Sequence, residues 1–279
     1  MKFARNFATS LFKVFTLAFL LVLLVTNPWV LANETTATDS ASLEAVLQSS
    51  ARAPENRDRD KYRHPLETLE FFGLGSNMTV VELWPGSGWY TEILALFLAE
   101  KGQLIVTSFD PQKNYIAKAF QQKLAANPTI FGKVKIAQID PPNELTLAPD
   151  NSADMVLTFR NIHNWVSAGF ADRVYAAAYK ALKPGGILGV VEHRAKPDTS
   201  LQQSIFTGYM SQEGVIAAIE KAGFKLADKS EINANPQDTK DYAGGVWSLP
   251  PTLSQGANDT RYLAIGESDR MTLKFVKPS

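Results

Sequence analysis

The chain has no cysteine among its 279 residues, only three histidines, and no excess of either charge. The absence of cysteine excludes disulfide scaffolds, thiolate zinc sites, iron–sulfur clusters and cysteine nucleophiles. With 28 basic and 28 acidic residues, the chain also lacks the basic excess of a nucleic-acid-binding protein. It does contain 45% apolar residues, enough to bury the core of one large domain or two small ones.

A long membrane-spanning run is also lacking near the N-terminus. The largely apolar run from Val14 to Val25 has 12 residues, whereas a spanning helix needs about 20. Three basic residues and no acidic one precede it, and Asn27-Pro28 then breaks the helix before Ala32. We therefore predict that residues 1–32 are a signal peptide cleaved after Ala32 and that the protein is exported to the periplasm. An uncleaved anchor, the alternative, would also export the chain.

Cleavage would leave 25 basic and 28 acidic residues, a net charge of −3, which again argues against a nucleic-acid partner. Residues 33–56 are rich in Thr, Ala, Ser and charge, and their apolar stripe is limited to Leu43, Val46 and Leu47. We predict a flexible tether that ends in a short helix and adds nothing to the core. The charged run over residues 57–63 is most simply a solvated surface, although the adjacent Y-R-H-P at residues 62–65 could form a flap over a bound ligand.

From residue 57 to residue 279 we predict one domain in which apolar and amphipathic stretches alternate. The apolar runs typical of buried strands cover residues 78–83, 103–109, 133–139, 154–159 and 187–192. Helix-like stretches lie between them at 89–100, 114–127 and 169–182, and the glycines of Lys183–Gly186 should form the turn after the last. This alternation predicts a parallel sheet with helices on both faces. An insertion rich in Pro, Gly, Asn and Asp at 233–260 should have some structure of its own.

Polar residues follow the ends of the predicted strands, where an open parallel sheet binds its ligands. The first strand ends in V-E-L-W-P-G-S-G-W-Y, in which Glu82 precedes a turn through Gly86 and Gly88 into a helix. Such glycines allow close approach of a ligand, and the start of a helix offers free N–H groups to an anion. The next two strands lead to Asp110 and Asp140, whose carboxylates suit a bound ligand but equally suit the capping of turns.

Taken in order, these motifs resemble those of the class I S-adenosylmethionine-dependent methyltransferases. The set also includes S-x-D-x-V-L at residues 152–157 and L-K-P-G-G at residues 182–186. The resemblance extends from about Arg57 to the C-terminus. It implies an α/β fold with a Rossmann-like, doubly wound sheet of seven strands in the order 3-2-1-4-5-7-6, the last strand antiparallel. The E-x-W-P-G-x-G-W-Y form is similar to an exported branch of predicted methyltransferases.

The same resemblance implies S-adenosyl-L-methionine as the cofactor. The cofactor-binding residues that we predict are Glu82, Trp84, Gly86, Gly88, Asp110, Asp140, Arg160 and Asn161. The glycine loop with Glu82 would hold the methionine end, Asp110 the ribose and Asp140 the adenine amine. Two residues depart from the family pattern, because Trp84 stands where glycine is usual and Pro85 removes one N–H from the loop.

Two histidines follow strands that should end at the same crevice. A neutral imidazole suits the removal of a proton from an acceptor as the methyl group arrives. We therefore predict His163 as the first choice of catalytic base and His193 as the second, the alternative being that both only hydrogen-bond neighbouring loops. Together with Glu192 they could ligate a metal, but the H-x-x-E and H-x-x-x-H spacings are absent, and we predict no metal site.

These features predict an exported S-adenosylmethionine-dependent methyltransferase that acts on a small-molecule acceptor. The alternative is a non-catalytic periplasmic ligand-binding protein that keeps the methyltransferase fold. No nucleic acid is expected as a partner, and no membrane after cleavage. The sequence identifies neither the acceptor nor the oligomeric state.

Overall fold

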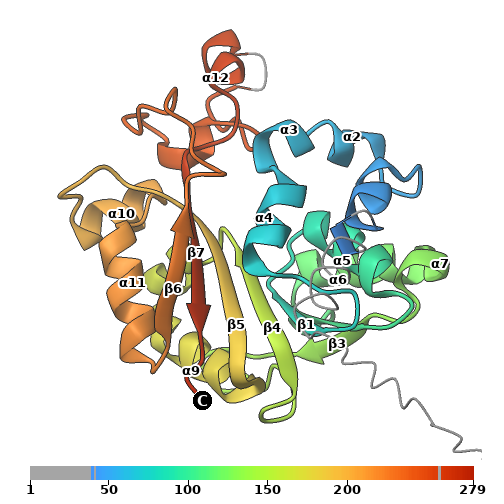
Figure 1. The fold of residues 1–279 in the computed structure, drawn as a ribbon. Coiled ribbons are helices and arrows are strands. Elements are labelled where there is room, and N and C mark those ends of the chain that lie inside the picture. The colour runs from blue at the N-terminus through green and yellow to red at the C-terminus, as the bar shows by residue number, and fades with distance from the viewer. Residues whose placement is uncertain (1–38, 41, 257–258) are drawn as a thin grey trace, which may run out of the picture.

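The computed structural model describes residues 39–40, 42–256 and 259–279, and the predicted signal peptide lies outside these ranges. Its centre is one sheet with the strand order β3-β2-β1-β4-β5-β7-β6 (Figure 1). The strands are β1 (Thr79–Leu83), β2 (Gln103–Ser108), β3 (Lys135–Gln138), β4 (Ala153–Phe159), β5 (Leu182–His193), β6 (Lys225–Ser230) and β7 (Arg270–Val276). The first five pair in parallel, whereas β7 is antiparallel to β5 and β6. The predicted fold and strand order are confirmed.

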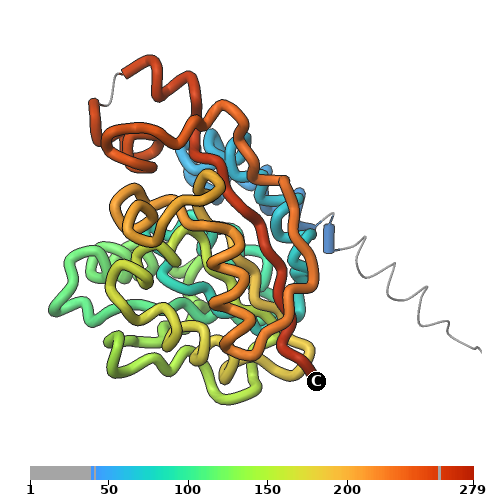
Figure 2. The backbone as a smooth tube through the Cα atoms, turned by 90° about the vertical axis from the view of Figure 1, so that its left-hand side faces the viewer, coloured from blue at the N-terminus to red at the C-terminus, as the bar shows by residue number. Residues whose placement is uncertain are grey.

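Helices cover both faces of the sheet, as Figures 1 and 2 show from two directions. The longer ones are α4 (Pro65–Phe72), α5 (Trp89–Leu98), α6 (Tyr115–Ala126), α9 (Ala171–Ala181) and α11 (Gln212–Lys221). The shorter ones are α2 (Pro54–Arg57), α3 (Asp60–Arg63), α7 (Pro128–Phe131), α8 (Ile162–Ser167), α10 (Leu201–Thr207), the 3-10 helix η1 (Gly245–Ser248) and α12 (Thr260–Ile265). Among the described residues, no helix is both long and apolar enough to cross a membrane.

Two hydrophobic clusters, one on each face, explain why the strands read as continuous apolar runs. Along β1, Val80 packs into the cluster that contains α4 and α5 side chains, whereas Val81 and Leu83 pack into the cluster of α9 and α11. All three are fully buried or nearly so. Because successive residues of a strand point to opposite faces, a strand covered on both faces needs apolar residues at every position.

The turn that we predicted at Lys183–Gly186 is wrong. Helix α9 ends at Ala181, and β5 already begins at Leu182, whose backbone is extended. Gly185 has a left-handed φ of 78°, and its N–H donates to the carbonyl of Lys277 at 2.8 Å. The stretch is therefore an irregular start of β5, and its glycine does not cap a helix. Helices α8 and α10 were not predicted, because six or seven residues are too few to show a helical period.

The prediction that residues 33–56 add nothing to the core is also wrong. Residues 42–48 are helical, and Leu43 and Leu47 are buried in the cluster that contains α4 and α5. Arg52 is fully buried and forms two hydrogen bonds to the carboxylate of Asp60, at 2.6 and 2.8 Å. Two leucines and one paired arginine therefore anchor a segment whose overall composition is polar.

Candidate functional site

A tight loop at the carboxyl end of β1 forms the centre of the candidate site. Trp84, Gly86 and Gly88 all have positive φ angles, of 45°, 60° and 80°. A left-handed backbone costs a residue with a side chain about 1 to 3 kcal/mol, so the surroundings must hold Trp84 in place. They do so through a hydrogen bond from its N–H to Thr107 Oγ1 at 2.8 Å and through its ring, whose centroid lies 5.0 Å from that of Trp165.

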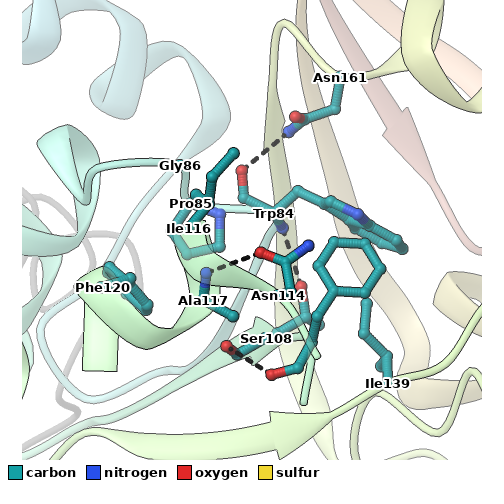
Figure 3. A pocket seen from close by; sticks show the side chains of 12 residues that line it. Trp84, Pro85, Gly86, Ser108, Asn114, Ile116, Ala117, Phe120, Ile139 and Asn161 are labelled. Carbon is teal, nitrogen blue, oxygen red and sulfur yellow. Dashed lines mark hydrogen bonds between the residues drawn. The ribbon is translucent and has the colours of Figure 1, made fainter. Parts of the chain in front are cut away.

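Two cavities open on either side of this loop, and both are lined by Trp84, Pro85, Gly86 and Asn161. The first, called here the apolar cavity, has a volume of about 170 Å³ (Figure 3). It is also lined by Thr107, Ser108, Phe109, Asn114, Ile116, Ala117, Phe120 and Ile139. The second, called the arginine cavity, has about 210 Å³ and is also lined by Arg59, Arg63, Glu82, Leu83, Ser87, Trp89, Tyr90, Phe159 and Arg160.

Gly86 faces open space at the junction of the two cavities. A Cβ atom placed on it would meet no other atom within 4 Å, so any side chain there would project into the site. Gly88 has a different role, since it precedes the first residue of α5 and a Cβ there would approach Phe120 to 2.9 Å. Asn161 closes the loop from the β4 side and donates to the carbonyls of Leu83 and Trp84 at 3.0 and 3.3 Å.

Within the apolar cavity, the polar side chains are few and, apart from Asn161, come from β2 and the start of α6. Ser108 lies at the end of β2, and Asn114 caps α6 by accepting the N–H of Ala117 at 2.9 Å (Figure 3). Sequence reasoning missed both residues. Ser108 occupies the position at which β2 ends, and a prediction of the exact end of this strand would have been needed to find it.

Asp110 and Asp140 lie near this cavity in sequence, but neither lines it. The carboxylate of Asp110 accepts the N–H of Gln112 at 2.8 Å and lies 3.8 Å from Lys113 Nζ, as a turn-capping residue does. The backbone of Asp140 forms a bridge with Glu144. The assignment of the ribose and adenine amine to these two carboxylates therefore stays a prediction from the resemblance.

Glu82 brings a buried carboxyl group to the arginine cavity. Its side chain accepts a hydrogen bond from Thr91 Oγ1 at 2.6 Å. Burial raises the pKa of Glu82 to about 7, although the Thr91 hydroxyl and the charge of Lys123 act in the opposite direction. The group therefore changes charge near neutral pH, and a cation bound beside it would favour the ionised form.

Arginines from distant parts of the chain converge on the same cavity around Glu267. Arg59, Arg63 and Arg270 all donate to its carboxylate, at distances from 2.7 to 3.1 Å. Burial alone would raise the pKa of Glu267, but the surrounding arginines lower it to about 2. The interpretation of residues 57–63 as a solvated charged run is wrong for Arg63, which is only 2% exposed. Its burial depends on Glu267, more than 200 residues away, and no local pattern could have shown it.

The two predicted catalytic histidines lie side by side beyond Asn161, with ring centroids 5.3 Å apart. His163 Nδ1 is 3.0 Å from Oε1 of Glu192, a carboxylate with no exposed surface that also accepts the backbone N–H groups of Ile162 and His193. His193 Nδ1 is 2.6 Å from Ser268 Oγ. Burial, followed by the charges of His163 and nearby arginines, lowers the pKa of His193 well below its usual value, so this imidazole is neutral.

The ligand-capable atoms of His163, Glu192 and His193 lie within 4.8 Å of one another, close enough to hold a metal ion. The surroundings disfavour a cation, however, because Arg160 and Arg270 act on His193 with like charge. Neither histidine lines the two cavities. Trp247 of η1 lies beside His163, with ring centroids 6.0 Å apart, so part of the predicted insertion covers this pair.

Comparison with known families gives one match to this region. The model of the family described as "Methyltransferase domain" matches residues 80–186, which include the glycine loop, the apolar cavity and His163. No curated protein matches the chain.

Solved structures with the same fold cover most of the chain at low identity. A SAM-dependent methyltransferase from Aquifex aeolicus is 15% identical, with 85% of this chain and 98% of that one covered and a TM-score of 0.53. The [4+2]-cyclase SpnF is 17% identical over 88% and 95%, with a TM-score of 0.56. The glycopeptide N-methyltransferase MtfA is 16% identical over 81% and 100%, with a TM-score of 0.52. These likenesses show the fold, and together with the family match they support a methyltransferase.

Proposed function

We propose that this protein is an S-adenosylmethionine-dependent methyltransferase that acts on a small-molecule acceptor. The observation that carries the proposal is the pair of unlike cavities joined at Gly86. The apolar cavity, with Phe109 and Ile139 and the amide of Asn114, suits a nucleoside. The arginine cavity offers both a carboxylate and guanidinium groups, as the ammonium and carboxylate of an amino acid require. The chain therefore fits both halves of the cofactor.

When bound, the cofactor supplies a methyl group activated by a sulfonium. The chain itself holds the reactants in line, which accounts for most of the catalysis that such a transfer needs. In this proposal His163 takes up the proton of the acceptor. Glu192 accepts the N–H of Nδ1 and thereby leaves Nε2 as the basic nitrogen, and its negative charge stabilises the imidazolium that forms. The backbone N–H groups that hold Glu192 fix this orientation.

We further propose that the protein is exported and acts in the periplasm. The support is the sequence of residues 1–32, with its basic start, short apolar run and small residue at position 32. The intact mass of the protein recovered from a cell envelope fraction checks this, since cleavage after Ala32 gives a chain that begins at Asn33.

Titration calorimetry with S-adenosylmethionine and S-adenosylhomocysteine tests the proposed function. We expect both to bind and Gly86→Leu to abolish binding, because the new side chain fills the junction of the cavities. Gly185→Leu is the matched control: its φ of 78° imposes similar strain and its Cβ also meets nothing within 4 Å, but it lies at the far end of β5. No heat from either ligand at millimolar concentration would favour the alternative of a non-catalytic ligand-binding protein.

A further inference from the structure

Arg160 is a cation without a partner at the arginine cavity. It directly follows β4, and its side chain donates no hydrogen bond to any of the described residues. Its backbone is left-handed, with a φ of 61°, a conformation that strains a residue with a side chain. Burial lowers the pKa of Arg160, the charge of Glu267 raises it, and the like charges of Arg270 and Arg59 lower it further. The folded chain therefore holds a partly buried guanidinium, on a strained backbone, that forms no side-chain hydrogen bond to the described residues.

The rest of the wall gives Arg160 no hydrogen-bonded counter-charge, although Glu267 and Glu192 attract it without direct contact. Glu267 already accepts hydrogen bonds from Arg59, Arg63 and Arg270. Arg63 in addition has a buried Nη2 with no acceptor among the described residues. The carboxylate of a bound amino acid occupies one guanidinium fork. After the cofactor is counted, the cavity still has more guanidinium donors than oxyanions.

The position of Arg160 links the cavity to the predicted base. The chain runs from Arg160 through Asn161 directly into α8, which carries His163. The charge of Arg160 also acts on Glu192 and His193, so the guanidinium lies within electrostatic reach of the histidine pair. A group bound by Arg160 therefore lies on the side where the acceptor meets its base.

We propose that the methyl acceptor carries an oxyanion group, a carboxylate or a phosphate, and that Arg160 binds this group. The inference rests on the proposed function, because it assigns a ligand to the acceptor side of that site. A guanidinium fork with no competing acceptor is preorganised for two parallel hydrogen bonds to such a group. Binding would also supply the hydrogen-bonded counter-charge that the free protein lacks.

Calorimetric titration of the protein saturated with S-adenosylhomocysteine tests this proposal. Sodium phosphate and sodium malonate are the probes, and sodium chloride of equal ionic strength is the reference. We expect at least one probe to bind without displacing S-adenosylhomocysteine. Arg160→Gln should weaken the binding of that probe to the saturated protein about tenfold or more. Arg261→Gln, an exposed arginine paired with Asp259, is the control and should leave this affinity unchanged.

A second readout requires no ligand. Because burial and the like charges of Arg270 and Arg59 outweigh the attraction of Glu267, Arg160→Gln should raise the melting temperature of the free protein, whereas Arg261→Gln should not. Competition between the probes and S-adenosylhomocysteine would overturn the proposal, since the anion site would then be that of the cofactor alone. Equal probe affinity in both variants would overturn it too. Failure of S-adenosylhomocysteine to bind a chain that still binds phosphate through Arg160 would instead overturn the methyltransferase proposal.

Discussion

The two cavities share one loop but are built in different ways. The residues of the apolar cavity all lie between Trp84 and Asn161 in the chain. The arginine cavity combines Arg59 and Arg63 from the N-terminal segment with Arg160, and Glu267 from just before β7 lies behind them. The apolar cavity thus rests on local contacts and packing, whereas the arginine cavity rests on charge and on contacts between the two ends of the chain.

Because their walls differ, the two cavities should also differ in function. Apolar walls bind through burial of area, which salt affects little, whereas desolvated arginines bind through charge. We therefore expect the apolar cavity to determine nucleoside affinity and the arginine side to determine chemistry and the choice of acceptor. Three substitutions, taken from the largest expected effect to the smallest, test this division.

The base lies beyond the arginine cavity, so its removal should slow the reaction without changing affinity in either cavity. His163→Gln should lower kcat roughly 10²-fold or more, because the substitution removes the ring nitrogen that takes up the proton. Turnover measured with saturating cofactor, together with calorimetry, checks both halves of this prediction. His193→Gln is the comparison and should have the smaller effect on rate. Wild-type turnover of His163→Gln with a lower melting temperature would make this histidine structural.

Substitution of Glu82 should show that ionisation of this buried carboxyl group opposes folding. Its pKa is about 7 in the folded chain against an ordinary 4.5, so the folded state keeps a proton that the unfolded state releases. Stability therefore falls as pH rises from 4.5 to 7, by about 3 kcal/mol for a shift of this size. Glu82→Gln removes this cost.

Urea denaturation checks this prediction. We expect Glu82→Gln to be more stable than the wild type by about 2 to 3 kcal/mol at pH 8, equally stable at pH 4, and weaker in binding the cofactor. The exposed Glu100→Gln should leave both unfolding curves unchanged. A difference between wild type and Glu82→Gln that does not vary with pH would show that the pKa of this carboxyl group is the same in the folded and unfolded chains.

The smallest effect concerns the polar group that marks the apolar cavity. Asn114→Ser keeps an oxygen that caps α6 but removes the amide donor, so affinity for the cofactor should fall by about 1 kcal/mol with little change in stability. Asp110→Ala is the comparison in the same titration. If Asp110 binds the ribose, as the resemblance implies, Asp110→Ala should weaken cofactor binding by about 1 to 3 kcal/mol. A loss of affinity larger in Asp110→Ala than in Asn114→Ser would support this assignment.

The features that could be predicted from the sequence are those set by local contacts, whereas those set by distant contacts were missed. The alternation of strands and helices and the loop from Glu82 to Gly88 follow from short-range patterns, the strand order follows from the resemblance, and the structure has all of them as predicted. Asn161 and Arg160 also follow a strand directly, and both line the arginine cavity. The burial of Leu43 and Arg63 was missed, because it depends on partners that no spacing in the sequence indicates.

The pairing of Glu267 with Arg59 and Arg63 also bears on the order in which the two cavities form during folding. These side chains are separated by 208 and 204 residues, so the wall that they form cannot exist until nearly all of the chain has been made. The glycine loop and the apolar cavity can assemble earlier, from residues close in sequence. We therefore expect the contacts of the apolar cavity to form before those of the arginine cavity, which is completed only when β7 joins the sheet. A ligand that spans both cavities holds the beginning and the end of the polypeptide together.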